Sequence, residues 1–177
     1  MRTTAITPVV LGLLAGGPRS GYDIKAIVDR STRFFWAASY GQIYPELRRL
    51  EAEGLIAGED APTGGRRRRL YKLTADGRQA LTDWLLGQRV TVELRDESLL
   101  RLFFADALPK EQALMLLEGR KRGHEQYLEA LRTIDARPGK DTPFVALVLR
   151  WGIDFHEWGA RWCQQQLERL RDETKAA

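Results

Sequence analysis

The stretch SYGQIYPELRRLEAEGLI, residues 39–56, decides the fold of the N-terminal half of the chain. Within it Ile43, Leu47 and Leu50 recur at i, i+4 and i+7, the spacing of one buried face of an α-helix. Gly54 follows the last of these apolar residues, and glycine is the residue type that commonly ends a helix. The stretch therefore predicts an amphipathic helix that stops at a defined point.

The start of this helix carries two conflicting signals. Ser39 and Gln42 have the spacing of a capping box, in which each side chain hydrogen-bonds the backbone of the other residue. Pro45 lacks a backbone N–H and is tolerated in a first turn but not in a helix interior. We therefore expect the regular helix to begin near Tyr44.

The outward surface of the helix carries polar and aromatic side chains of long reach. Glutamine can pair with adenine, arginine with guanine or phosphate, and tyrosine hydroxyls with phosphates, all from a helix in the major groove. An ordinary solvated face is the alternative, and three glutamates in the same stretch favour it. On the first interpretation, the predicted DNA contacts on this helix are Ser39, Tyr40, Gln42, Tyr44, Arg48 and Arg49.

Two helices are predicted before residue 39. Thr7 and Pro8 are typical of a helix start, with the threonine as cap, and the run Gly16-Gly17-Pro18 ends that helix. Ser20 then caps a second helix, which we expect to stop near Ser31.

A hairpin is predicted after residue 54. Residues 55–59 and 66–73 have the pattern of short strands, and residues 60–65 that of a turn. Four consecutive arginines, Arg66, Arg67, Arg68 and Arg69, lie on the turn and the second strand, where guanidinium groups can reach phosphates or a minor groove. A nuclear-localisation signal or a chance solvated cluster would also carry such a run.

The order helix, helix, helix, hairpin is that of a winged helix-turn-helix. The strings SGYDIKAIVDRSTRFFWAASYGQIYPELRRLEAEGLIAGE and GGRRRRLYKLTADGRQAL resemble the N-terminal domain of the PadR family of bacterial regulators, over about residues 6–86. The resemblance implies that the helix after Ser39 is the recognition helix and that the arginine hairpin is the wing. It also implies DNA contacts from Tyr40, Gln42, Tyr44 and Arg48.

The helix pattern continues beyond the hairpin. Thr74 caps a fourth helix, with Leu81, Trp84 and Leu85 as its expected buried stripe. We place a winged helix-turn-helix DNA-binding domain at residues 1–88 and a helical domain for dimerisation, with a possible effector site, at residues 89–177. The fold class expected is mainly α, with a two-stranded wing.

The helical domain is predicted to contain a helix at residues 95–108, a long helix at residues 110–136 and a last helix from Pro143 to beyond Leu170. The last helix carries apolar residues at alternating steps of four and three, the period of a coiled-coil-like interface. These residues are Phe144, Val148, Trp151, Phe155, Trp158 and Trp162. They either form the core of this domain or pair with a second chain, which would give a two-fold dimer.

The family resemblance extends to this half through pattern more than residue identity. It implies a homodimer on an operator of double-stranded DNA with inverted half-sites. Some family members bind planar effectors such as phenolic acids at aromatic residues of the dimer interface. Trp151, Phe155 and Trp158 are the positions at which we expect such a small aromatic effector.

Composition narrows the function classes further. Residues 1–90 carry a charge balance of +5 and residues 91–177 a balance of −1, so the positive charge lies in the N-terminal half. Cys163 is the only cysteine and the apolar stretch at residues 9–15 is too short to span a bilayer, so we expect a cytoplasmic protein without membrane contact. No catalytic motif, metal site or cofactor site is present, so we do not expect an enzyme. A sequence-tolerant architectural DNA-binding protein is the alternative to a repressor.

Overall fold

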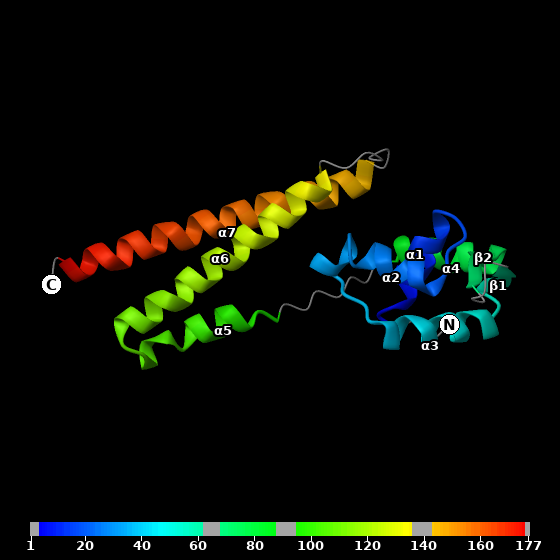
Figure 1. Ribbon diagram of the computed structural model, residues 1–177, viewed down its shortest axis with the longest axis horizontal. Helices are drawn as coiled ribbons and strands as arrows, with labels where there is room; N and C mark the ends of the chain where they lie inside the picture. The colour runs from blue at the N-terminus through cyan, green and yellow to red at the C-terminus, as the bar shows by residue number, and fades with distance from the viewer. Residues whose placement is uncertain (1–3, 62–67, 88–94, 136–142, 176–177) are drawn as a thin grey trace. The chain divides into compact units, whose positions relative to one another are not determined.

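The computed structural model describes residues 4–61, 68–87, 95–135 and 143–175. The chain divides into two compact units, Met1–Thr91 and Val92–Ala177. Over these described residues, the first unit contains four α-helices, a 3-10 turn and a two-stranded sheet, and the second contains three α-helices and a 3-10 turn (Figure 1). This is the mainly helical winged fold that the sequence predicts.

The first helix, α1, spans Thr7–Ala15, with Pro8 in its first turn. The prediction that Thr7 caps it is wrong, because Ile6 holds the cap position and no side chain caps the helix. Thr7 is instead the first helical residue and is buried, with 1% of its surface exposed. The helix ends before Gly16 as predicted, and Gly17 then adopts a positive φ of 118° that favours glycine.

The second helix, α2, spans Gly21–Val28 and is capped by Ser20 as predicted. Ser20 and Asp23 form a capping box, in which the Ser20 backbone N–H donates to Asp23 Oδ2 at 2.9 Å. The helix stops three residues before Ser31. A 3-10 turn, Thr32–Phe34, follows before the chain reaches the next helix.

The third helix, α3, spans Tyr40–Ala52 and begins four residues earlier than expected. Pro45 lies inside it, and its missing N–H removes one backbone hydrogen bond, to the carbonyl of Gly41. The helix persists because Ile43, Leu47 and Leu50 on its inner face are completely buried. Burial of each such side chain contributes about 1.5–3 kcal/mol.

The wing is a two-stranded antiparallel sheet of β1, Ile56–Ala61, and β2, Arg68–Leu73. Its register pairs Ile56 with Leu73 and Ala61 with Arg68. Arg19, just before α2, exchanges backbone hydrogen bonds with Tyr71 at 2.8 and 3.0 Å. The wing is therefore attached to the helices through its backbone.

The fourth helix, α4, spans Ala75–Leu85, and Thr74 caps it by accepting from the Gly77 N–H at 3.0 Å. The predicted buried stripe is wrong for two of its three residues, because Trp84 is 50% and Leu85 64% exposed. A Cβ on Gly77 would lie 1.9 Å from the Leu55 carbonyl oxygen. The helix therefore docks through its first turn, and its last turn extends beyond the core.

The second unit contains α5, Glu97–Phe103, the 3-10 helix Ala105–Ala107, α6, Lys110–Asp135, and α7, Pro143–Lys175. The single helix expected at residues 95–108 is thus divided in two. Helices α6 and α7 pack along each other as an antiparallel pair (Figure 1). Their buried residues include Leu117, Leu131, Ile153, Cys163 and Leu167.

We define the aromatic row of α7 as Phe144, Val148, Trp151, Phe155, Trp158 and Trp162. Trp162 is partly buried and packs against the cluster of Leu117, Cys163 and Leu167. Phe144 is 79%, Trp151 64% and Trp158 55% exposed. Most of the row therefore lies outside the core of the α6–α7 pair, whereas Trp162 contributes to it. Among the described helices, none is long and apolar enough to cross a membrane.

Candidate DNA-binding surface

The N-terminal end of α3 is fixed by its capping box. Gln42 Oε1 accepts from the Ser39 backbone N–H at 3.0 Å and from the Ser39 hydroxyl at 3.1 Å. Bidentate pairing with adenine requires both the oxygen and the nitrogen of a glutamine amide. With its oxygen engaged in the cap, Gln42 can offer the Nε2 donor to a base.

Two exposed tyrosines lie one turn apart on the outer surface of α3. The Tyr40 and Tyr44 rings stack with their centroids 6.1 Å apart. Tyr40 is 45% exposed and Tyr44 is 40% exposed. The ammonium of Lys25 lies 5.4 Å from the Tyr40 ring centroid. A Cβ on Gly21 would lie 2.7 Å from the Tyr44 ring, so the glycine at the start of α2 allows this tyrosine to approach closely. Both rings therefore have close neighbours within the first unit and remain partly exposed.

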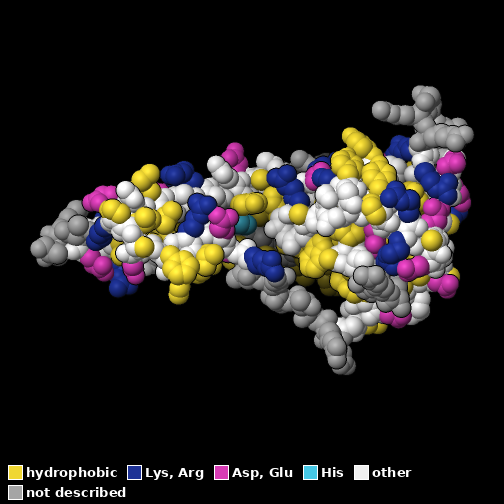
Figure 2. Space-filling view, turned by 90° about the horizontal axis from the view of Figure 1, so that it is seen from below, with side chains coloured by type: hydrophobic (Ala, Val, Ile, Leu, Met, Phe, Trp, Pro, Cys, Tyr) yellow, Lys and Arg dark blue, Asp and Glu magenta, His cyan; other side chains and the backbone are white. Residues whose placement is uncertain are grey.

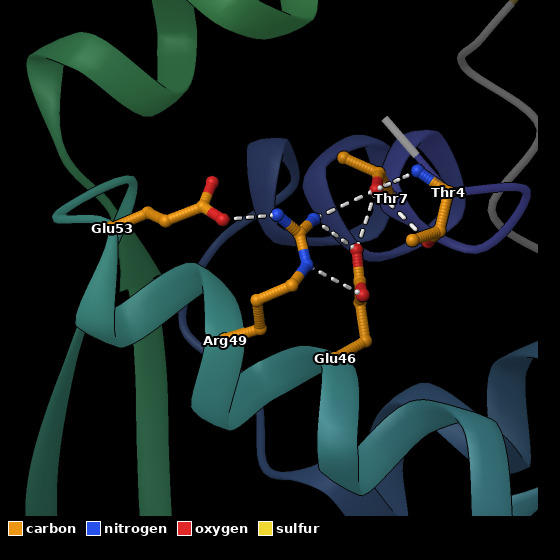
Figure 3. Close-up of polar contacts among 5 residues, drawn as sticks. All are labelled: Thr4, Thr7, Glu46, Arg49 and Glu53. Carbon is orange, nitrogen blue, oxygen red and sulfur yellow. Dashed lines mark hydrogen bonds and ion pairs between the residues drawn. The ribbon is translucent and has the colours of Figure 1, made fainter. Parts of the chain in front are cut away.

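The two neighbouring arginines of α3 have different surroundings. Arg48 is exposed, and the described ranges contain no ion pair of its guanidinium. Arg49 turns toward α1 and is held by two carboxylates of its own helix, Glu46 and Glu53, at 2.6 and 2.5 Å (Figure 3). Arg48 thus extends the surface of Tyr40 and Tyr44, whereas Arg49 does not.

A polar network connects α3 to α1 beneath this surface. Thr7 Oγ1 donates to Glu46 Oε1 at 2.5 Å and accepts from Arg49 Nη2 at 3.0 Å and from the Thr4 backbone N–H at 3.0 Å. Burial opposes ionisation of Glu46, but the hydrogen bonds from Arg49 and Thr7 outweigh it and keep the pKa of Glu46 below its ordinary value. Figure 3 shows the network between the first turn of α1 and the middle of α3.

The described basic residues of the wing are paired with carboxylates. Arg68 pairs with Asp23 of α2, and Lys72 pairs with Glu59 across the sheet. Arg69 donates to Glu51 of α3 at 2.6 Å and to Asp60 at 3.0 Å. Arg66 and Arg67 lie outside the described residues.

Asp23 therefore serves both the cap of α2 and the wing. Partial burial opposes its ionisation, but hydrogen bonds from Ser20 and Arg68 outweigh this and lower the pKa of Asp23. Glu51 similarly accepts from the Gly58 backbone N–H at 3.0 Å as well as from Arg69. These carboxylates hold the wing against α2 and α3.

Aromatic rings gather on the second unit. The rings of Trp151 and Phe155 stack, with their centroids 5.4 Å apart and an angle of 6° between their planes. The ring centroid of Trp158 lies 6.4 Å from that of Phe155. Figure 2 shows hydrophobic side chains on the exposed surface of this unit. The predicted effector residues are therefore neighbours on one helix face and are accessible.

A pair of histidines lies beside these rings. His124 of α6 and His156 of α7 face each other with their Nδ1 atoms 3.0 Å apart, and Tyr127 stacks on His156 at 5.0 Å. Burial and the neighbouring imidazole lower the pKa of His156 to about 4, and burial also lowers the pKa of His124. Both rings are neutral at pH 7, so one donates a hydrogen bond to the other.

The contact between Thr7 of α1 and Glu46 of α3 was not predicted from the sequence. A signal was present, because Glu46 occupies the i+3 position of the apolar pattern that starts at Ile43. A carboxylate at a core position of a helix requires partners, since an unpaired buried charge is strongly unfavourable. Its buried partner Thr7 lies 39 residues away and shows no such signal.

Comparison with known proteins agrees with this geometry. The model of the transcriptional regulator PadR-like family matches residues 10–83, and a second family model, Virulence activator alpha C-term, matches residues 94–171. The chain is 34% identical to the negative transcriptional regulator PadR of Bacillus subtilis over 125 residues, which cover 70% of this chain and 69% of that protein.

Solved structures resemble most of the chain. Bacillus subtilis PadR in complex with operator DNA superposes with a TM-score of 0.85 at 28% identity, covering 94% of this chain and 99% of that chain. Bacillus subtilis PadR in complex with p-coumaric acid has a TM-score of 0.77 at 28% identity and covers 94% and 96%.

These comparisons confirm the predicted family and the predicted winged helix-turn-helix with C-terminal helices. They also support the prediction that the chain is not an enzyme, because its relatives are transcriptional regulators. The chain belongs to the PadR-like family of transcriptional regulators.

Proposed function

We propose that this regulator is a repressor that binds a palindromic operator as a homodimer. The observation that carries the proposal is the two-sided character of α3. Its inner face is completely buried at Ile43, Leu47 and Leu50, whereas Tyr40 and Tyr44 on its outer face are 45% and 40% exposed. The related Bacillus subtilis protein, named a negative regulator, has been solved on operator DNA.

The proposed base-reading and phosphate-contacting groups on α3 are the Gln42 amide nitrogen, the hydroxyls of Ser39, Tyr40 and Tyr44, and the Arg48 guanidinium. Arg49 is left out, because Glu46 and Glu53 neutralise it on the side of α1. On the wing, Arg66 and Arg67 provide positive charge. When DNA binds, Arg68 and Arg69 exchange their carboxylate partners for DNA phosphates. This exchange is favourable only where the phosphates lie close to the two guanidinium groups.

The homodimer is proposed to form through the aromatic row of α7. An exposed stripe of large apolar side chains requires a partner surface, and a second copy supplies an identical one across a two-fold axis. Two recognition helices related by that axis read inverted half-sites about one helical turn apart. A palindromic operator follows from this symmetry.

The proposed effector is a small aromatic molecule that binds at Trp151, Phe155 and Trp158. The related protein solved with p-coumaric acid supports a ligand of this class. Flat rings of the protein can pack against a planar ligand, and a ligand between two copies changes the spacing of their winged units. Titration with phenolic acids should change tryptophan fluorescence and release the protein from the operator. If neither change occurred, the proposal of an aromatic effector would be refuted.

Selection of bound fragments from random duplex DNA tests the main proposal. We expect enrichment of one palindrome, bound about a thousandfold more tightly than unrelated DNA. A sequence-tolerant architectural protein would instead enrich no sequence and would show only a steep dependence on salt. A reporter gene behind the selected palindrome then distinguishes repression from activation.

A further inference from the structure

Glu46 is a carboxylate on the inner face of the recognition helix. It lies among Ile43, Leu47 and Leu50, and only 6% of it is exposed. A charged group at such a position is unfavourable unless partners replace its lost hydration. The contacts of Glu46 therefore explain why α3 can carry it.

The partners of Glu46 come from two helices. Arg49 of α3 binds it in a bidentate manner, through Nη2 to Oε1 at 2.6 Å and Nε to Oε2 at 3.1 Å. Thr7 of α1 donates its hydroxyl to the same Oε1 and accepts from the same Arg49 nitrogen. The three side chains form a closed triangle, which Figure 3 shows together with Thr4 and Glu53.

This triangle restricts the rotation of α3 about its own axis. Apolar contacts are non-directional, so the buried leucines alone tolerate small rotations. Hydrogen bonds to a buried carboxylate weaken steeply when their angles change. Because a helix with side chains has a radius of about 5–6 Å, a rotation of roughly 10° moves its outer side chains by about 1 Å. Binding geometry must be held to about 0.5 Å and 10–20°.

We infer that Glu46, Thr7 and Arg49 are positioning residues for operator recognition, setting the angle at which α3 presents Tyr40, Gln42 and Arg48 to the bases. The inference rests on the proposed function, because it concerns the proposed operator-reading surface. Base contacts depend on this angle, whereas attraction to phosphates through the wing does not. Loss of the triangle therefore lowers specificity more than overall DNA affinity.

Substitutions at Thr7 test the inference most directly. Thr7→Val keeps the shape of the side chain and removes the hydroxyl, whereas Thr7→Ser keeps the hydroxyl. The probes are the labelled palindrome selected by the wild-type protein and an unrelated duplex of the same length, measured by fluorescence anisotropy. We expect Thr7→Val to reduce the ratio of specific to non-specific affinity about tenfold. Thr7→Ser should remain within about twofold of wild type.

Two matched controls separate positioning from stability. Glu53→Gln removes the other carboxylate partner of Arg49, which does not contact Thr7, and should leave the ratio unchanged. Val10→Ala weakens the packing of the same helix, α1, where Val10 is completely buried and apolar. It should lower the urea midpoint without changing the ratio. The inference would be overturned if Val10→Ala and Thr7→Val lowered the ratio of specific to non-specific affinity equally.

Arg49→Lys decides the result if Thr7→Val does not fold. Lysine keeps the charge but lacks the planar fork that binds both oxygens of Glu46. We expect the ratio to fall about threefold to tenfold with an unchanged salt dependence. An unchanged ratio would overturn the inference. A wild-type protein that selects no palindrome would instead refute the proposed function, and the inference with it, before any variant is compared.

Discussion

Helices α3 and α7 place their apolar residues in opposite ways. In α3 the periodic apolar face is completely buried within its own unit, and the exposed face is polar and aromatic. In α7 the large side chains of Phe144, Trp151 and Trp158 are more than half exposed, while smaller residues such as Ile153 and Cys163 are buried. The first helix is thus complete within one chain, whereas the second has an apolar surface that a partner or ligand can cover.

The largest effect is expected in the buried face of α3. Leu47→Ala should lower the free energy of unfolding by about 2–5 kcal/mol, because it leaves a cavity in a closed core. Urea denaturation followed by circular dichroism measures this. The same change at Leu86, which is 78% exposed, should alter the unfolding free energy by less than about 0.5 kcal/mol. Similar losses at both sites would show that α3 is not the centre of this core.

A smaller effect is expected on the outer face of α3. Gln42→Ala should weaken operator binding by about 0.5–1.5 kcal/mol, because it removes the single Nε2 hydrogen bond to a base, and should relax the preference at one base position. Arg67→Ala should weaken all sequences alike and reduce the dependence of binding on salt. Anisotropy titrations on a panel of single-base operator variants measure both. If Gln42→Ala weakened every sequence equally, Gln42 would not read a base.

The exposed row of α7 should control association. Trp151→Asp places a charge in a stripe that the proposed dimer buries, so we expect the dimer dissociation constant to rise at least about tenfold. Gln164→Asp introduces the same residue at a partly exposed position of α7 that lies about 180° around the helix from Phe155. Sedimentation equilibrium should show little change for this control. A Trp151→Asp protein that remains as dimeric as wild type would place the interface elsewhere.

The smallest effect concerns pH. His156 has a pKa of about 4 in the folded chain against about 6.5 when unfolded, so the unfolded state binds more protons between these values. Stability should therefore fall by about 1 kcal/mol as pH decreases from 6.5 to about 5.5, and should continue to fall toward pH 4. In this window Asp96 stays ionised, because hydrogen bonds from Ser98 and Arg120 outweigh its burial and lower its pKa to about 2.

Thermal unfolding across this pH range, with His156→Phe as the comparison, measures the effect. Phenylalanine preserves the stacking with Tyr127 and does not titrate, so the dependence on pH should become weaker. Charged groups around the pair include Arg120 and Asp96, whose fields act on His124. An equally steep dependence in the variant would assign the effect to other groups.

The sequence predicted most of the first unit because its signals are local. The caps at Ser20 and Thr74, the capping box of Ser39 and the ends of the helices follow from side chains within three or four residues of each other. The errors arose where packing overrides local preference. Thr7 is buried and hydrogen-bonds Glu46 instead of capping α1. Pro45 is tolerated because the free energy gained by burying the inner face of α3 outweighs one lost hydrogen bond.

In the candidate site too, local sequence signals predicted some features and only the tertiary structure showed the others. Helical periodicity alone placed Tyr40, Gln42, Tyr44 and Arg48 on the outside of α3. The apolar residues identify the inner face, and the remaining positions must then lie on the outer face. It also grouped Arg49 with them, because adjacent arginines are alike in composition and both lie off the apolar face. The tertiary structure separated the two, since only Arg49 lies within reach of α1 and the buried pair of Thr7 and Glu46. Local spacing determines which face a residue lies on, but only the packing of distant segments determines which partner it meets there.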